Sequence, residues 1–358
     1  MRFFTPGRIH FGWSSSNAVS ELEGRVAVIS GHNVWSSVRD YLNVNGEVYL
    51  LSRSTSTGEP IEDDVMKIVE FLKETTPEVI IAVGGGSVID SAKLARVFYV
   101  YPHIGWSDVY SANIPSLSHS SSFVAIETTS GTGTGISAAA VVIDGRGVKH
   151  GVVSPELIPD MAIYDPALVL TMPRKVAIYS GMDALTHAIE AYVSRIDNIP
   201  ADTLALKAID LIFTNLPMSV DGLEEPRAMV HYGNMMAAMG FANSRLGLCH
   251  AASHKIGGRI GMEHGKVNAI LLPHFIRATR KYTSRFETIE KMLNVDDLAS
   301  AIEDINDVFG IPRHIPEIEE YIDTIVGEIM ADPLMRTNPG EMSSDEIRDF
   351  LLKVANVV

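Results

Sequence analysis

The first half of the chain alternates short apolar runs, rich in β-branched residues, with stretches whose apolar residues recur at helical spacing. This alternation favours a parallel sheet with covering helices, because parallel strands need crossover connections and are buried on both faces. Residues 60–77 show one such crossover, where the helical pattern ends at a proline. We therefore predict an α/β region with a mostly parallel sheet, whose strands include residues 25–30, 47–51, 78–86, 122–127 and 138–144.

The second half of the chain has almost no strand-like runs after about residue 170. Its long segments have apolar residues with a period near 3.6, which predicts helices. Two prolines and the change of periodicity coincide within residues 164–181, and a length of 358 residues favours two domains. We predict an α/β dinucleotide-binding domain over residues 1–165 and an all-helical domain over residues 166–358.

Charge and composition exclude several classes of partner. The formal net charge of −15 disfavours a nucleic-acid partner, because phosphate-backbone binding usually needs a basic surface. The chain has one cysteine, so an internal disulfide is impossible, which fits a reducing compartment. No run of eighteen uninterrupted apolar residues occurs. We expect a cytoplasmic protein with a small-molecule substrate and without a nucleic-acid or membrane partner.

Two glycine-rich turns follow predicted strands. Residues 84–93 (GGGSVIDSAK) lead from a strand into a helix, where glycines allow close approach of a ligand and free amides favour a phosphate. Residues 128–135 (TTSGTGTG) combine glycines and hydroxyls after another strand. Taken singly, these are compatible with a tight turn and a flexible loop. Together they indicate a nucleotide site, because α/β sheets bind ligands beyond the carboxyl ends of their strands.

Two pairs of possible metal ligands stand four residues apart in predicted helices. Asp183 and His187 form one pair, and His250 and His254 form the other. Residues at this spacing lie on one face of a helix and can reach a single ion. The alternatives are an aspartate that favours the helix dipole beside an ordinary polar histidine, and a buried histidine pair bonded to the backbone. The spacing alone leaves these alternatives open.

The chain resembles the iron-containing alcohol dehydrogenase family, whose fold is similar to that of dehydroquinate synthase. The resemblance runs in order over nearly the whole chain, from RIHFG at residues 8–12 to residues 332–347. It depends most on four segments: 84–93, 128–135, 164–194 and 246–274. It implies an α/β nucleotide-binding domain followed by a helical domain that holds the metal and the catalytic residues.

The resemblance also implies a ligand set. Asp183, His187, His250 and His264 match the family's metal ligands, whereas His254 is placed near the nicotinamide and substrate, in a proton-relay or hydrogen-bonding role. One carboxylate and three imidazoles suit Fe²⁺ or Zn²⁺.

The cofactor is implied to be NADP(H) or NAD(H). The matching positions are Gly85, Gly86, Ser87, Asp90, Thr128, Thr129, Thr132, Ser137 and Lys149. NAD-preferring members tend to have an aspartate where this chain has Gly31. An acidic group there would bind the ribose 2′-hydroxyl and repel a 2′-phosphate, so Gly31 favours NADP(H).

The chain departs from the family pattern at three positions. Glu127 stands where proline is common, Gly135 where glutamate is common, and Glu263 where proline is frequent. Glu263 is either a partner of the ligand His264 or a solvated side chain. Cys249 is expected to be a small buried residue, because the ligand set is complete without it.

The function implied is a metal-dependent alcohol dehydrogenase, or aldehyde reductase, that transfers hydride between the nicotinamide and a primary alcohol or aldehyde in the interdomain cleft. A metal ion would lower the pKa of the alcohol or polarise the aldehyde. The alternatives are a glycerol dehydrogenase-like polyol oxidoreductase, a dehydroquinate synthase-like lyase, and a catalytically silent nucleotide- or metal-binding protein. We expect a homo-oligomer, a dimer.

Overall fold

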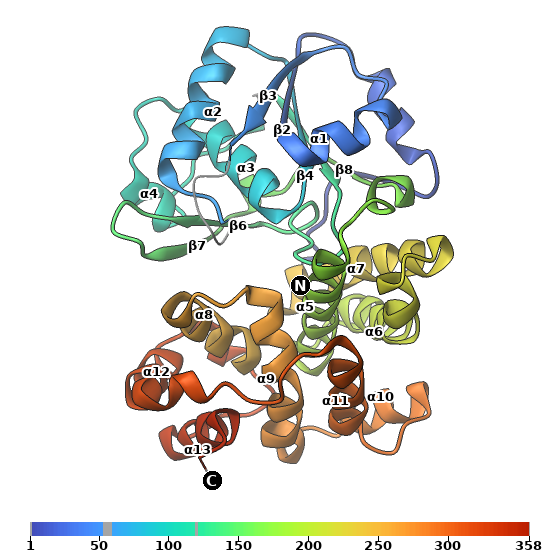
Figure 1. Cartoon of the computed structure of the whole chain (residues 1–358). Coiled ribbons are helices and arrows are strands. Elements are labelled where there is room, and N and C mark those ends of the chain that lie inside the picture. Colours follow the sequence, from blue (N-terminus) through green and yellow to red (C-terminus); the bar gives the residue numbers. More distant parts are fainter. Residues whose placement is uncertain (1, 53–58, 119–120, 358) are drawn as a thin grey trace. The chain divides into compact units, whose positions relative to one another are not determined.

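A computed structural model describes residues 2–52, 59–118 and 121–357 of the chain. The chain divides into two compact units, Met1–Pro173 and Arg174–Val358 (Figure 1). The predicted domain boundary between residues 165 and 166 falls within the last turns of the first unit. That each unit is an independent domain stays a prediction.

The first unit contains a six-stranded sheet in which all neighbouring strands are parallel. The strand order is β1-β8-β5-β4-β2-β3, which confirms the mostly parallel sheet. The strands are β1 (Arg8–Phe11), β2 (Val26–Gly31), β3 (Glu47–Leu51), β4 (Val79–Gly84), β5 (Ser122–Glu127) and β8 (Met161–Tyr164). The two four-residue strands β1 and β8 are not among the predicted runs.

The prediction that residues 138–144 join this sheet is wrong. Strand β6 (Ala139–Ile143) pairs antiparallel with β7 (Lys149–Val153) in a separate two-stranded ribbon. Its side chains alternate between buried and half-buried, which is the pattern of a strand covered on one face only. The turn between them is closed by Asp144, which accepts hydrogen bonds from the amides of Arg146 and Val148.

Apolar side chains cover both faces of the sheet. In β4, Ile80 and Ala82 belong to one apolar cluster, and Ile81 and Val83 belong to the other. Helices α2 (Glu62–Thr75) and α3 (Gly86–Val100) supply the first cluster, and α1 (His32–Val38) contributes to the second (Figure 1). The remaining helices are α4 (Trp106–Tyr110) and the short 3-10 helices Ser15–Glu21, Arg39–Tyr41, Pro155–Leu157 and Pro166–Val169.

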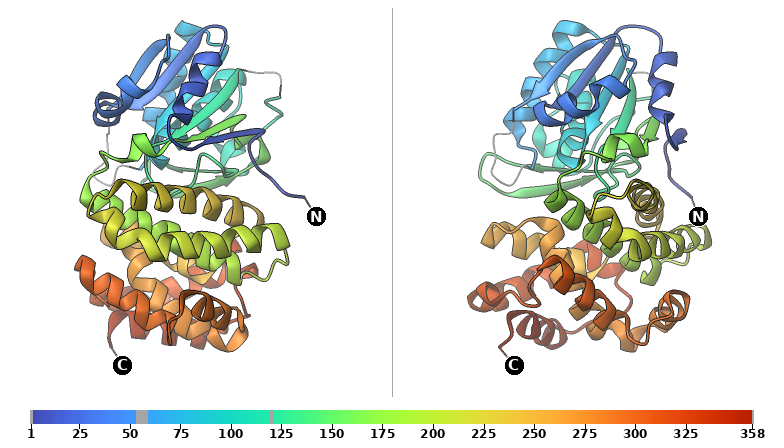
Figure 2. Two further views of the ribbon diagram at one scale, coloured as in Figure 1. Left: turned by 90° about the vertical axis from the view of Figure 1, so that its right-hand side faces the viewer. Right: turned by 45° about the vertical axis from the view of Figure 1, so that its right-hand side comes forward.

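The second unit consists of helices joined by loops and has no strand among the residues that the structure describes, as predicted. Figure 2 shows α6 and α7 side by side, and both pack against α5. Glycines permit this close packing: a Cβ on Gly181 would lie 2.3 Å from Leu216 Cδ1, and one on Gly233 would lie 2.6 Å from Ile212 Cγ1. The helices are α5 (Arg174–Val193), α6 (Ile199–Val220), α7 (Glu224–Ser244), α8 (Leu248–Ile260), α9 (His264–Thr279), α10 (Arg285–Leu293), α11 (Leu298–Phe309), α12 (Ile322–Met330) and α13 (Ser344–Ala355), with 3-10 helices at Arg280–Tyr282, Pro316–Tyr321 and Pro333–Arg336.

Helix α6 is long and apolar enough to cross a membrane by length and composition alone. Its buried face, which includes Ile209 and Ile212, packs against other helices of the unit. Its polar face carries Asp202, which pairs with Arg285 at 3.0 Å. These contacts are those of an amphipathic core helix.

Candidate functional site

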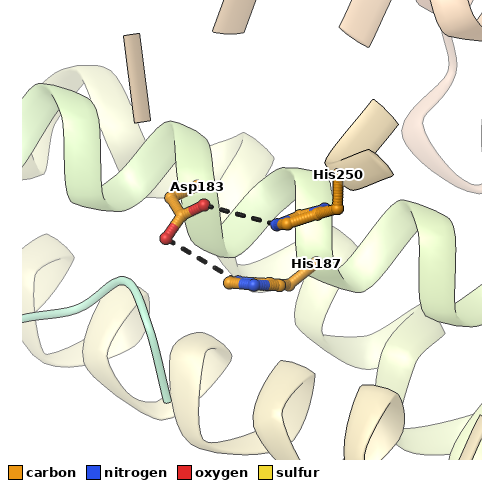
Figure 3. A group of neighbouring side chains, drawn as sticks. All are labelled: Asp183, His187 and His250. Carbon is orange, nitrogen blue, oxygen red and sulfur yellow. Dashed lines mark ion pairs between the residues drawn. The ribbon is translucent and has the colours of Figure 1, made fainter. Parts of the chain in front are cut away.

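Helices α5, α8 and α9 bring four possible metal ligands together. Asp183 and His187 lie on successive turns of α5, His250 lies in the first turn of α8, and His264 begins α9. Ligand atoms of Asp183, His187 and His250 lie within 4.8 Å of one another (Figure 3). The predicted ligands therefore converge from three segments of the helical unit, while their role as ligands stays a prediction.

The distances within this cluster fit a shared cation. Asp183 Oδ1 lies 3.6 Å from His250 Nε2 and 3.5 Å from His264 Nε2, and Asp183 Oδ2 lies 3.9 Å from His187 Nδ1. These separations are too long for good hydrogen bonds. Donors held at about 2.1 Å from one tetrahedral ion lie about 3.4 Å apart, which is close to the observed spacing. The donor set and its spacing thus fit a divalent metal.

Burial and charge also suit a cation. Burial alone raises the pKa of Asp183, but His187, His264 and His250 outweigh burial and lower that pKa well below its usual range. Burial likewise disfavours the charged form of His250, yet Glu190 and Asp183 outweigh it and raise the pKa of His250 to about 9. Two buried carboxylates therefore hold positive charge at this site, which is the environment that a metal ion requires.

Neighbouring side chains orient the two histidines that face Asp183. His250 Nδ1 contacts the carboxylate of Glu190, and His264 Nδ1 lies 3.0 Å from Ser253 Oγ. With each Nδ1 engaged, the Nε2 atoms face Asp183. Sequence reasoning missed Glu190, although it lies seven residues after Asp183 and so on the same face of α5.

Asn268 of α9 was also missed. It is fully buried, and its Nδ2 lies 2.7 Å from Asp183 Oδ1 and 3.2 Å from the Nε2 atoms of both His250 and His264. Its position four residues after His264, on the same face of α9, is the signal that could have found it.

His254 lies beside the cluster. Its ring centroid is 5.1 Å from that of His264 and 6.1 Å from that of His250, and the side chain is half-buried. His254 is not one of the three described residues, Asp183, His187 and His250, whose ligand atoms lie within 4.8 Å of one another. The proton-handling role of His254 stays a prediction.

In the first unit, the two glycine-rich turns contact each other. Gly85 and Gly86 connect β4 to α3. A Cβ on Gly85 would lie 2.9 Å from Thr129 Cγ2, and one on Gly86 would lie 2.7 Å from Thr132 Cγ2. Only glycine therefore fits at these two positions without displacing the second loop. The two predicted cofactor loops form one surface at the carboxyl ends of β4 and β5.

The other predicted cofactor residues differ in exposure. Ser87 and Thr129 are half-buried, Thr132 is exposed, and Thr128 and Ser137 are buried. Their contacts with a cofactor stay predictions.

Two buried charged residues of α3, Asp90 and Lys93, bind the end of the second loop and the start of β6. Asp90 Oδ1 accepts a hydrogen bond from Thr134 Oγ1 at 2.5 Å, and Asp90 Oδ2 accepts one from the amide of Val141 at 3.0 Å. Lys93 Nζ donates to the carbonyl oxygens of Thr134, Ser137 and Ala139 at 2.7, 2.7 and 2.9 Å. Asp90 was predicted to be a cofactor-binding residue, and here one of its oxygens is engaged by the second loop and the other by β6.

Of the two remaining predicted cofactor residues, Gly31 has open space beside it and Lys149 forms an ion pair. Gly31 ends β2 and precedes α1, and a Cβ there would meet no atom within 4 Å. The position is therefore open. Lys149 starts β7 and pairs with Glu59 at 2.5 Å.

The first two departures from the family pattern are in contact. Glu127 Oε1 accepts a hydrogen bond from the amide of Gly135 at 2.7 Å, and a Cβ on Gly135 would lie 3.0 Å from Glu127 Cγ. Burial raises the pKa of Glu127 to about 8. The carboxyl group of Glu127 therefore packs over the backbone that Gly135 leaves uncovered.

The third departure, Glu263, is exposed, and the single cysteine, Cys249, is buried. The exposed carboxylate of Glu263 pairs with Lys175, so it lies in a solvated ion pair. Cys249 is fully buried, as predicted.

Comparisons with known proteins indicate the same family over nearly the whole chain. The family models "Iron-containing alcohol dehydrogenase" and "Fe-containing alcohol dehydrogenase family, C-terminal" match residues 6–166 and 177–355. The NADPH-dependent butanol dehydrogenase of Clostridium saccharobutylicum is 34% identical over 97% of this chain and 96% of that protein. An alcohol dehydrogenase of Thermococcus barophilus is 35% identical over 98% of each. The solved structure of an iron-containing alcohol dehydrogenase from Thermococcus thioreducens has a TM-score of 0.89 and 32% identity, covering 99% of this chain and 100% of that one.

Proposed function

Because this chain belongs to the iron-containing alcohol dehydrogenase family, we propose that it transfers hydride between NADP(H) and a primary alcohol or aldehyde. The observation that carries this proposal is the convergence of the buried residues Asp183, His187 and His250 with the half-buried His264 in one cluster. The relatives named above are alcohol dehydrogenases, which does not favour the polyol oxidoreductase, lyase and silent-protein alternatives.

The four side chains of this cluster would hold one divalent metal, Fe²⁺ or Zn²⁺. When bound, such an ion supplies Lewis acidity, which lowers the pKa of an alcohol and polarises a carbonyl. Asp183 contributes the negative charge of the set, and the three neutral imidazoles complete it without further charge. His254 lies beside His264 and would pass the hydroxyl proton outward.

The two glycine-rich turns would bind the dinucleotide. Gly85, Gly86 and Ser87 present backbone amides at the start of α3, where a pyrophosphate is favoured. Thr128, Thr129, Thr132 and Ser137 supply hydroxyls from the second loop. The open position at Gly31 supports NADP(H) over NAD(H), and one relative is named as NADPH-dependent.

We also propose that the protein is a cytoplasmic homodimer. The single cysteine supports a reducing compartment. Size-exclusion chromatography with light scattering would measure the oligomeric state directly.

The activity is tested by following NADPH and NADH absorbance with a panel of aldehydes, using chelator-treated protein and protein reconstituted with Fe²⁺ or Zn²⁺. We expect NADPH oxidation with a short primary aldehyde only after reconstitution. Equal turnover in the metal-free protein would overturn the proposed chemistry. Activity with NADH alone would overturn the cofactor preference and leave the reaction class intact.

A further inference from the structure

Glu190 is a buried carboxylate with three hydrogen-bonding contacts, and it lies next to a predicted metal ligand. Its side chain is 1% exposed. Oε1 accepts hydrogen bonds from the amides of Gly247 at 3.0 Å and Cys249 at 2.9 Å, and Oε2 contacts His250 Nδ1. A buried carboxylate is costly unless its oxygens are satisfied, and here both are.

Two of these contacts serve the start of α8. The first amides of a helix have no partner within the helix. Glu190 accepts from the amides of Gly247 and Cys249, and Asn338 Oδ1 accepts from the amide of Leu248 at 3.2 Å. Glu190 and Asn338 therefore cap the same helix end, but only Glu190 also contacts His250.

The third contact determines the protonation of His250. An ionised carboxylate only accepts hydrogen bonds, so His250 Nδ1 must carry a proton to bind Glu190. In neutral imidazole, a proton on Nδ1 leaves a lone pair on Nε2, the form that ligates metals. The opposite tautomer would place the Nδ1 lone pair against a buried carboxylate.

Asn268 supports the same tautomer independently. Its Nδ2 must face the acceptor-only carboxylate of Asp183, 2.7 Å away, and this fixes the orientation of the amide. The same Nδ2 lies 3.2 Å from His250 Nε2, a contact that suits a lone pair on Nε2.

We propose that Glu190 is a positioning residue of the metal centre, which fixes the Nδ1–H tautomer of His250 so that Nε2 is presented to the divalent cation. This inference rests on the proposed function, because it assumes that His250 ligates a metal. A partner that fixes the tautomer of a ligating histidine also raises its basicity, and removing such a partner costs about 10–100-fold in metal affinity.

The Glu190→Gln variant separates this role from helix capping. Its single side-chain oxygen must face the amides of Gly247 and Cys249, because its amino group cannot accept their hydrogen bonds. The amino group then faces His250 Nδ1 and donates to it, so the proton of His250 moves to Nε2. The substitution therefore keeps the cap and reverses the tautomer.

Asn338→Ala is the matched control, since it removes an acceptor from the same helix end without touching His250. Chelator-treated wild type and variants are titrated with Co²⁺, whose visible spectrum reports the ligand set, and with Zn²⁺ against a competing chelator. The melting temperature of each metal-free protein is also measured. Should Asn338→Ala not fold, Asn338→Ser removes the same amide group, keeps a hydroxyl and adds no charge, and serves as the second control.

We expect Glu190→Gln to weaken metal binding by about 10–100-fold and to alter the Co²⁺ spectrum, with a metal-free melting temperature close to wild type. We expect Asn338→Ala to lower the melting temperature and to leave metal affinity within about threefold, because it removes the cap on Leu248 and the hydrogen bond to Gly340 but no contact with His250. Wild-type affinity in Glu190→Gln, or equal losses in both variants, would overturn the inference. A wild type that binds neither metal would instead overturn the proposed function, and with it the premise of the inference.

Discussion

The buried carboxyl group of Glu127 accepts a hydrogen bond from the backbone amide of Gly135, eight residues further along the chain. Each residue departs from the pattern of the family that the chain resembles, and the structure shows that the two departures are complementary. A Cβ at position 135 would lie 3.0 Å from Glu127 Cγ, which is a tight contact.

The first prediction follows from this contact. Gly135→Ala places a methyl group 3.0 Å from Glu127 Cγ in a fully buried setting, so it should destabilise the protein by about 1–3 kcal/mol. The same substitution in a Glu127→Ala background should cost less, because the side chain in tight contact with position 135 is gone. Chemical denaturation of the four proteins measures the coupling.

Gly151→Ala is the control for this cycle, because a Cβ at Gly151 meets no atom within 4 Å. Its effect on the free energy of unfolding should be the same with and without Glu127. Additive effects of Gly135→Ala and Glu127→Ala would show that the two positions are not coupled.

The second prediction concerns pH. Burial raises the pKa of Glu127 from its ordinary value of 4.5 to about 8, so the folded state keeps a proton that the unfolded chain releases between these values. This contribution to stability is complete below the lower value and is lost as the pH rises through the higher one, with a slope of at most about 1.4 kcal/mol per pH unit. Glu127→Gln cannot titrate, so its melting temperature relative to wild type should rise between about pH 5.5 and about pH 7.5.

This pH range avoids a second buried group. Burial lowers the pKa of Lys93, against the opposing effect of Asp90 and Glu127, to about 8, so Lys93 stays charged below that value. Ionisable groups that do not interact with Glu127 contribute equally to both proteins and cancel in the difference. A difference in melting temperature that does not change with pH would show that Glu127 titrates normally.

The third prediction separates two histidines whose rings stack 5.1 Å apart. His264→Ala removes a proposed ligand, so metal affinity should fall by at least about 100-fold and turnover should disappear, while NADPH still binds. His254→Ala should retain the metal and lower kcat by about 10²–10⁴-fold, as expected for the loss of a proton-transfer group. Metal analysis, NADPH fluorescence and steady-state kinetics on the two variants measure these effects. Loss of metal from His254→Ala would assign His254 to the ligand set.

Much of the fold could be predicted from the sequence, because the spacing of apolar residues indicates which faces of a helix or strand are buried. Parallel strands such as residues 79–84 are covered on both faces and read as unbroken apolar runs. Residues 139–143 have a similar composition but pair in an antiparallel ribbon, because composition does not identify a strand's partner. The four-residue strands β1 and β8 are too short to show a period.

The cluster around Asp183 could be predicted from the sequence only in part. Spacing and resemblance indicated the four candidate ligands, and three helices bring them together. Glu190 and Asn268 were missed although each lies on the same helix face as a candidate ligand, because that spacing alone does not distinguish them from other polar residues of a helix. Their roles depend on contacts between helices, such as the one from Glu190 to the start of α8. Sequence spacing within one helix does not report such contacts.

The last prediction concerns cofactor preference. Gly31 has an extended backbone, with φ −86° and ψ 148°, and space for a side chain, so Gly31→Asp should fold without strain. Aspartate also suits this position because it precedes the first residue of α1. Its carboxylate would accept from a ribose 2′-hydroxyl and repel a 2′-phosphate. We expect kcat/KM with NADPH to fall at least tenfold, which is about 1.4 kcal/mol, and kcat/KM with NADH to rise.

Gly31→Ala is the control, since it adds a methyl group without charge and should leave the ratio of the two kcat/KM values within about twofold. If Gly31→Asp lowered both values equally, the side chain would obstruct the dinucleotide rather than select against the 2′-phosphate. If it changed neither, the ribose would lie away from the end of β2, and the cofactor preference would have to be assigned to other residues of the two glycine-rich turns. The selective loss of NADPH is therefore the outcome that places the 2′-phosphate beside Gly31.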